Sequence, residues 1–335
     1  MLTRSETELD TVIVATPLRG GCCSKPYSFT DGVEIREIKS ILWELAVAGK
    51  LLSEDDREYL NSSQYWLSVT ERIENWSFGQ SDDQLYERAR HAMFALQILC
   101  PSGGRNLYLK LHDTPSGLDN VGSMHPARMH STSIGRLTVL EHQGLQPDFD
   151  KVYRGVRRSF SEGIVRLQNP IVLLEQGLQA GHVYLSTLMW VMGLDMLLMA
   201  GEKVPFVERA IGFLGRDTQV FPAVLQSNRQ PKLEVAEIVD DIYELRNLVA
   251  HGREIPFKPF RQSHDIVDST EAPLTYESTY AQVIMESALF LLVKSLRKIM
   301  VEGLVDVVKD EANWKRRLKT SAKLERQRAV TRPGE

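Results

Sequence analysis

The segment from Asp240 to Gly252 reads Asp-Asp-Ile-Tyr-Glu-Leu-Arg-Asn-Leu-Val-Ala-His-Gly, and the interpretation of the C-terminal half begins with this segment. On a 3.6-residue period, Ile238, Ile242, Leu245 and Val249 share one side of a helix. The opposite side is polar and contains Asp240, Glu244, Asn247 and His251, with Arg246 on the flank. Glycine commonly ends a helix in a left-handed turn. The pattern therefore predicts a surface helix from Leu233 to His251.

The end of this predicted helix has an unusual composition. Arg246 and Asn247 are followed by three apolar residues and then by His251 and Gly252. This spacing resembles the R-(polar)-x3-H signature of the HEPN superfamily, helical domains that include many metal-independent ribonucleases. Asn after the Arg and Gly after the His most resemble the Apea-type HEPN domains of bacterial defence proteins. As in that family, a long apolar helix with one acidic residue near its end, here Asp195, precedes the motif. The resemblance covers roughly residues 149–308.

RNA cleavage without a metal needs a group that takes the 2′-OH proton, a charge that neutralises the phosphate and a donor for the leaving 5′-oxygen. Arg binds two phosphate oxygens with a permanent charge, and His transfers protons near neutral pH. The resemblance implies that Arg246 and His251 are catalytic, that Asn247 assists, and that Asp195 and Tyr243 support them. The expected products are a 2′,3′-cyclic phosphate and a 5′-hydroxyl. No cofactor and no metal ion is expected.

Geometry within one helix limits this site. Positions 246 and 251 lie about 140° apart around an ideal helix, so their side chains do not simply converge. Two motif helices that meet across a two-fold axis would complete the site, as in HEPN nucleases, and a homodimer is therefore expected. A buried Asp195 needs a partner, and Arg246 is the predicted one. The alternative is an exposed Asp195 that pairs with Lys203 or with nothing.

Other functions of the motif stay open. Arg246 could form a plain ion pair and His251 could cap the helix, with no reaction. Inactive HEPN domains serve as modules for dimerisation or RNA binding. The chain could also be the toxin of a two-component pair, silenced by an antitoxin or another regulatory partner near His251.

A length of 335 residues predicts two domains. We expect a mainly α protein. Residues 1–145 would form an N-terminal mixed α+β, mostly helical, recognition or regulatory domain of unknown ligand. Residues 146–310 would form the HEPN-type helical bundle, and residues 311–335 a basic tail.

Local patterns predict the individual elements. Strands are predicted at 11–15, 106–112 and 136–141. In the N-terminal half, helices are predicted at 33–48, 54–76 and 82–99. In the C-terminal half, helices are predicted at 148–167, 171–200, 206–214, 233–251 and 276–302, with Pro170 in the first turn of the second of these. Residues 215–231 would be a loop, and residues 314–328 would be helical or frayed.

The charge of the chain is unevenly distributed. Residues 315–335 contain eight Lys or Arg and two Glu, a net charge of +6, so the other residues carry −10 of the total −4. A basic tail can bind a nucleic-acid backbone by releasing counterions, and Lys315, Arg316, Arg317 and Lys319 are the predicted contacts to RNA. A solvated helix end that favours solubility is the alternative interpretation.

Several classes of protein are disfavoured. Three cysteines do not form a disulfide framework, the acidic N-terminus is not typical of a signal peptide, and Val183 to Ala200 is interpreted as a core helix rather than a membrane span. A cytoplasmic protein is expected. The spacings of His112, Asp113, His125, His130 and His142 match no metal motif. The methionines at 189, 192, 196 and 199 are interpreted as core packing.

Overall fold

The structure is a computed structural model of the whole chain. It describes the following residues: 9–19, 26–37, 63–74, 83–101, 108–114, 117–124, 145–180, 182–220, 233–253 and 279–331.

The chain divides into two compact units. The first comprises Met1–Met129 with Thr138–Tyr153, and the second comprises His130–Leu137 with Arg154–Glu335. The division falls within helix α4 (Leu145–Ser161). Most of the described residues are helical, so the predicted mainly α class is confirmed.

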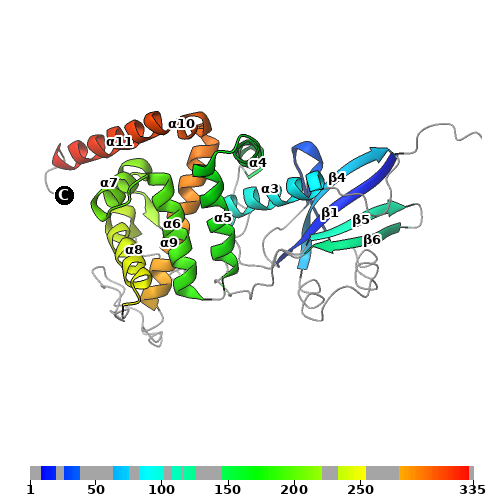
Figure 1. The fold of residues 1–335 in the computed structure, drawn as a ribbon, viewed down its shortest axis with the longest axis horizontal. Coiled ribbons are helices and arrows are strands. Elements are labelled where there is room, and N and C mark those ends of the chain that lie inside the picture. Colours follow the sequence, from blue (N-terminus) through cyan, green and yellow to red (C-terminus); the bar gives the residue numbers. More distant parts are fainter. Residues whose placement is uncertain are drawn as a thin grey trace, which may run out of the picture. The chain divides into compact units, whose positions relative to one another are not determined.

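The N-terminal unit contains a six-stranded antiparallel sheet with the order β2-β3-β4-β1-β5-β6. Its longest pair joins β1 to β4, with Val14 opposite Val69. Helix α3 (Asp83–Leu99) packs against these two strands and buries Leu85, Ala92 and Leu96. The strands are β1 (Leu9–Arg19), β2 (Tyr27–Ser28), β3 (Val33–Glu37), β4 (Ser63–Glu74), β5 (Tyr108–Thr114) and β6 (Gly117–Met124), as Figure 1 shows.

The N-terminal predictions are partly wrong. Helix α3 and strand β5 confirm the helix at 82–99 and the strand at 106–112. The helices predicted at 33–48 and 54–76 are contradicted by strands β3 and β4. In β4 the run Tyr65–Val69 is buried on both faces, so it lacks the alternation that identifies a strand. The described part of this unit holds more strand than helix, which corrects the expectation of a mostly helical domain. The strand predicted at 136–141 lies outside the described residues.

Strand β1 is also longer than its predicted core at 11–15. It continues through Pro17, which lies opposite Trp66 of β4. Proline is tolerated in a strand where its missing N–H faces no ladder partner. The ladder to β5 covers only Thr11 to Ala15, so Pro17 lies beyond it.

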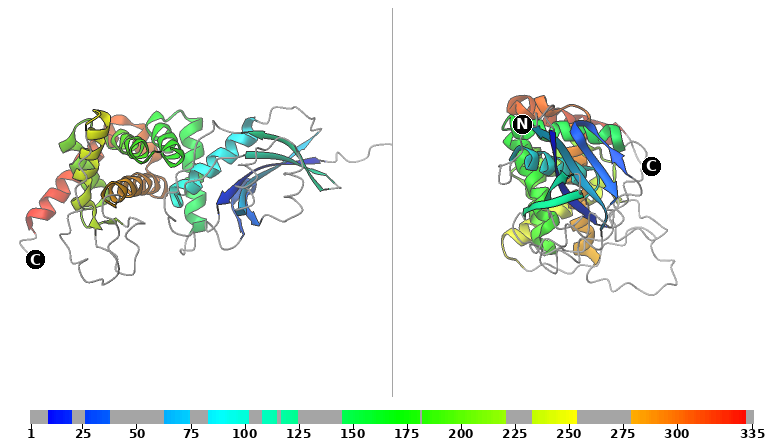
Figure 2. Two further views of the ribbon diagram at one scale, coloured as in Figure 1. Left: turned by 90° about the horizontal axis from the view of Figure 1, so that it is seen from below. Right: turned by 90° about the vertical axis from the view of Figure 1, so that its right-hand side faces the viewer.

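The C-terminal unit is a bundle of helices, which confirms the predicted helical architecture (Figures 1 and 2). Helix α6 contacts four other helices, namely α5, α7, α8 and α9. Gly177 lets α5 approach α6, since a Cβ there would lie 2.2 Å from Nε1 of Trp190. The helices are α5 (Val165–Gln179), α6 (Val183–Leu198), α7 (Lys203–Leu214), α8 (Val235–Ala250), α9 (Thr279–Val301), α10 (Val305–Lys309) and α11 (Glu311–Thr331).

The helix predicted at 171–200, for which the glycine at 181 suggested a bend, is two helices, and the chain breaks close to that position. The backbone is extended at Ala180 and at His182, which ends α5 and begins α6. Pro170 lies inside α5 and not in its first turn, because α5 begins at Val165. The predicted loop at 215–231 contains a short strand, β7 (Gln219–Val220). It pairs with a second short strand, β8 (Leu233–Glu234), which directly precedes α8.

No single helix among the described residues is long and apolar enough to cross a membrane. Helices α6 and α7 reach the length and apolar composition of a membrane span only when they are taken together, and the two helices are bent by 76° relative to each other.

Candidate active site at the end of helix α8

Helix α8 presents the motif as the sequence predicts. Its buried face includes Ile238, Ile242 and Leu245, so the predicted apolar side is confirmed. At its start, the Glu237 carboxylate accepts the Glu234 backbone N–H at 2.8 Å. This contact satisfies one of the free N–H groups that every helix start exposes. Packing of one face against α6, α7 and α9 fixes the direction in which the motif residues project.

The C-terminal end of α8 is a tight left-handed turn. His251 is the capping residue, and Gly252 has φ +60°. The Arg253 N–H donates to the Leu248 carbonyl at 2.9 Å, and the Gly252 N–H donates to the Val249 carbonyl at 3.2 Å. These two bonds form the Schellman arrangement, which satisfies carbonyls that the helix end leaves open. The predicted helix end at Gly252 is confirmed.

Arg246 is held by three neighbours. Its Nη2 lies 3.8 Å from Oδ2 of Asp195 on α6, and its Nη1 donates to Oδ1 of Asn247 at 2.8 Å. Its guanidinium lies over the Tyr243 ring, 5.2 Å from the centroid. The side chains of Arg246 and Asp195 are 24% and 14% exposed, so solvent reaches the pair only in part. The predicted contact between Arg246 and Asp195 is therefore present.

The turn between α6 and α7 positions the Asp195–Arg246 pair through hydrogen bonds to Gly201. Asp195 Oδ1 accepts the Gly201 N–H at 2.9 Å, and the Tyr243 hydroxyl donates to the Gly201 carbonyl at 3.4 Å. Met199 and Gly201 both have positive φ, at 52° and 70°. Arg209 donates to the Leu198 carbonyl at 2.9 Å and also to the Met199 carbonyl. The turn thus orients the carboxylate that in turn orients Arg246.

Lys203 does not pair with Asp195, which was the alternative. Its Nζ lies 3.1 Å from Oδ2 of Asp240 and also contacts Glu244, both on α8. Hydrogen bonds that Lys203 donates, first to Glu244 and then to Asp240, raise the pKa of Lys203 above its usual value. This exposed cluster ties the start of α7 to the polar side of α8.

His251 stands apart from Arg246 within one chain. It is exposed, and its side chain forms no hydrogen bond or ion pair with the described residues. Its backbone N–H donates to the Asn247 carbonyl at 3.1 Å, whereas the Asn247 side chain faces Arg246. No hydrogen bond joins the Asn247 side chain to the His251 ring. Asn247 instead helps to position Arg246.

An exposed apolar surface borders the Asp195–Arg246 pair. Leu185, Met192 and Met196 of α6 are 44%, 40% and 40% exposed. Asp195 lies on the same helix, immediately before Met196. The prediction that the α6 methionines are core packing is therefore wrong for Met192 and Met196, because the side of α6 that carries them is not covered.

The predicted RNA contacts lie on α11. Lys315, Arg316, Arg317 and Lys319 are all exposed. Arg316 donates to Asn313, and Arg317 Nη2 lies 3.9 Å from Oε2 of Glu302. Residues 314–328 are helical throughout, which is one of the two states the sequence allows.

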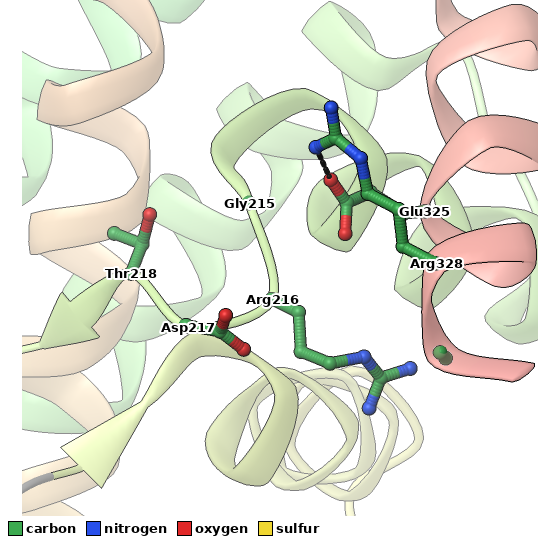
Figure 3. Close-up of a pocket in the computed structure, with 7 residues that line it drawn as sticks. Gly215, Arg216, Asp217, Thr218, Glu325 and Arg328 are labelled. Atoms are coloured by element: carbon green, nitrogen blue, oxygen red, sulfur yellow. Dashed lines mark hydrogen bonds and ion pairs between the residues drawn. The ribbon is translucent and has the colours of Figure 1, made fainter. Parts of the chain in front are cut away.

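Sequence reasoning did not single out a pocket between α11 and the turn at 215–218. The cavity has a volume of about 320 Å³. Figure 3 shows Arg216 extending from the turn toward the end of α11, and Arg328 paired with Glu325 at 2.7 Å. The turn is bonded to the start of α8, since the Val235 N–H donates to the Thr218 carbonyl at 2.9 Å. The pocket and His251 therefore lie at opposite ends of α8. No spacing in the sequence could have indicated the pocket, because its lining comes from segments more than 100 residues apart.

Of the histidines considered as metal ligands, His125, His130 and His142 lie outside the described residues, as do the side chains of His112 and Asp113. Comparisons of the chain with protein-family models, with curated proteins and with solved structures found no match.

Proposed function

We propose that the protein is a metal-independent endoribonuclease of the HEPN type that acts as a homodimer, in a bacterial defence or toxin role. One observation supports this most strongly. Arg246 is fixed at the last turns of α8 by Asp195, Asn247 and Tyr243, while His251 is exposed at the end of the same helix. A positioned cation for the phosphate and an unengaged imidazole for proton transfer are two of the groups that metal-free RNA cleavage requires.

The proposed reaction is an internal transfer at phosphorus. The 2′-oxygen attacks the phosphorus as its proton passes to a base, and the bond from phosphorus to the 5′-oxygen breaks. The leaving oxygen takes up a proton, which gives a 2′,3′-cyclic phosphate and a 5′-hydroxyl. Arg246 would neutralise the charge on the phosphate oxygens, and His251 would carry a proton.

Dimerisation would complete this site. Arg246 and His251 do not meet in one chain, so a second motif helix must supply the missing group. The exposed apolar surface of Leu185, Met192 and Met196 borders Asp195 and is suited to burial against a second copy. A dimer formed there would bring two Asp195–Arg246 pairs near one another.

A binding module without activity is the second candidate. The observation that favours it is the Asn247 side chain, which bonds to Arg246 and leaves the His251 ring without an orienting partner among the described residues. In that case Arg246 would hold an RNA phosphate and no bond would break.

The experiment that separates these functions is RNA cleavage in EDTA by the wild type, Arg246→Ala and His251→Ala. His182→Ala is the matched control, because His182 is also exposed and begins α6, outside the motif. The proposal expects loss of cleavage in both motif variants and full activity in the control. Equal weak activity in all four proteins would indicate a contaminating nuclease. The inactive binding module would then be the remaining candidate function.

A further inference from the structure

Helix α11 has a fixed orientation on the bundle. Its apolar side is buried through Trp314, Leu318 and Ala322. The Trp314 indole N–H donates to the Leu197 carbonyl at 2.6 Å. Gly212 of α7 allows a close crossing, since a Cβ there would lie 2.5 Å from the Ala322 backbone nitrogen. The direction in which each cation of α11 projects is therefore determined by this packing.

The arginines of α11 are already engaged. Arg317 pairs with Glu302 at 3.9 Å, Arg328 pairs with Glu325 at 2.7 Å, and Arg326 pairs with Glu208. Each of these three ion pairs reduces the charge that remains available for an external anion. Arg316 donates to the neutral Asn313 side chain and keeps its charge, on the side of the helix next to Lys319 and Lys323.

The lysines differ from the arginines. Lys315, Lys319 and Lys323 are exposed and form no ion pair or hydrogen bond with any residue that the structure describes. They recur every four residues, so they follow one flank of the helix with successive Cα atoms about 6 Å apart. Arg317 and Arg328 lie on the other flank. The free positive charge of α11 is thus a line along one side, and we call Lys315, Lys319 and Lys323 the lysine row.

We propose that the lysine row binds the phosphate backbone of single-stranded RNA and holds the substrate at a distance from the motif. The identity of the RNA as substrate rests on the proposed function, but binding can be measured without cleavage. Ammonium groups contact phosphates as point charges without reading the bases, so the binding is independent of sequence. The rest of the chain is acidic, which makes α11 the favoured place for a polyanion.

The packing of α11 favours RNA over a membrane surface. A helix that lies on a bilayer buries its apolar side in the interface. Here that side is occupied by α7, because Trp314, Leu318 and Ala322 are all buried in the bundle. Leu324 and Val330 are exposed, but they lie about 120° apart around the helix and form no continuous apolar side that could insert. The exposed surface of α11 is therefore mainly charged, which suits a nucleic-acid backbone.

The lysine row runs along α11 between two places on the bundle. It begins next to Trp314, whose indole N–H donates to the Leu197 carbonyl of α6, two residues from Asp195. The C-terminal end of α11 adjoins the turn at 215–218, which bonds to the first turn of α8. His251 lies at the other end of α8, about 24 Å along a helix of 16 residues.

The test measures affinity for a labelled oligouridine between about 50 and 200 mM salt. The His251→Ala background keeps the RNA intact. Lys319→Gln with Lys323→Gln is compared with Lys309→Gln with Arg328→Gln, a control pair that changes the net charge equally and whose members form ion pairs with Glu162 and Glu325. Loss of two phosphate contacts should make the slope of log K against log salt less steep by about 1.4 in the lysine pair, and the control pair should change it little.

Three other outcomes would contradict the lysine row. Equal changes in both pairs would mean a general charge effect, and no change in either would place RNA elsewhere. Binding to anionic vesicles but not to oligouridine would assign α11 to a lipid surface. Normal binding by a wild type that cleaves nothing would reject the ribonuclease proposal and leave the lysine row standing.

Discussion

Arg246 of α8 lies 3.8 Å from Asp195 of α6, and the same carboxylate accepts the Gly201 N–H at 2.9 Å. One acidic side chain thus links the motif helix to the turn that begins α7. The pair is only partly exposed, so its contribution to the position of Arg246 exceeds that of an ordinary surface ion pair.

Replacing Asp195 with Asn tests this positioning. Asn keeps an oxygen that can accept the Gly201 N–H but removes the charge that faces Arg246. We expect RNA cleavage to fall by about 10- to 100-fold, because small displacements of a positioned group have effects of this size. The thermal midpoint should change little. Asp240→Asn, which removes one partner of Lys203, is the control and should cleave normally. Full activity in Asp195→Asn would show that the pair has no role in the site.

Two substitutions at Tyr243 separate its ring from its hydroxyl. The ring lies beneath Arg246 and 5.0 Å from the Phe206 ring, whereas the hydroxyl makes one bond of 3.4 Å. Tyr243→Phe should lower the free energy of unfolding by about 1 kcal/mol or less and preserve cleavage. Tyr243→Ala should cost about 3–5 kcal/mol, since it leaves a cavity. Urea titration measures both, and an equal loss in the two variants would contradict a role for the ring.

Met192→Glu tests the proposed dimer surface. A charge buried without a partner costs roughly 3–5 kcal/mol, so the dimer dissociation constant should rise by at least about 100-fold. Sedimentation velocity should find a monomer, and cleavage should be lost with it. Val165→Glu changes another exposed apolar residue, at the start of α5, and should leave the dimer intact. A Met192→Glu protein that remains dimeric would place the interface elsewhere.

The cluster around Arg158 predicts a dependence of stability on pH. The Arg158 guanidinium donates to Asp306 at 3.0 Å and to Glu162 at 2.5 Å, and these hydrogen bonds hold the pKa of both carboxyl groups below their usual values. Lys309 lowers the pKa of Glu162 further. Because the folded pKa values are depressed, the stabilisation is present above the ordinary values of 4.5 and 3.8 and is lost as pH falls through the folded ones.

Arg158→Gln should therefore destabilise the protein at neutral pH and differ little from the wild type once both carboxylates are protonated. Chemical denaturation of both proteins, from neutral pH down to the pH at which the two carboxylates are protonated, measures the difference in the free energy of unfolding. Salt should reduce this difference because the groups are exposed. A difference that is constant with pH would mean that Arg158 acts through packing and not through these carboxylates.

Gly212→Ala tests the crossing of α7 and α11. The new Cβ would lie 2.5 Å from backbone atoms of Ala322, which cannot move as a side chain can. We expect a loss of about 1–3 kcal/mol in the free energy of unfolding. Gly193→Ala is the control, because its Cβ would lie 3.3 Å from the flexible Leu292 side chain and 3.4 Å from the Pro170 Cα, without a backbone clash, and a helix gains from the replacement. A Gly212→Ala protein as stable as the wild type would exclude the close crossing.

The sequence predicted the motif helix well because its signals are local. The period of Ile238, Ile242 and Leu245 and the glycine at 252 depend on neighbours within a few turns. Asp195 was also predictable, since a carboxylate in an apolar helix near its end requires a partner.

The errors have non-local causes. Strand β4 lacks the alternation of a half-buried strand because Tyr65–Val69 is buried on both faces, and its partner in β1, with Val14 opposite Val69, lies 55 residues earlier in the chain. The orientation of the Asn247 amide toward Arg246 depends on where α6 places Asp195, so spacing alone could not assign it. The separation of engaged arginines from free lysines on α11 depends on Glu208 and Glu302, which belong to other helices.

The most direct measurement of the central claim is the chemistry of the RNA ends produced in EDTA by the purified wild type. We expect the wild type and His182→Ala to produce 2′,3′-cyclic phosphate and 5′-hydroxyl ends, and His251→Ala to produce neither. Ends with a 5′-phosphate, or cleavage that appears only when a divalent metal ion is added, would contradict the central claim.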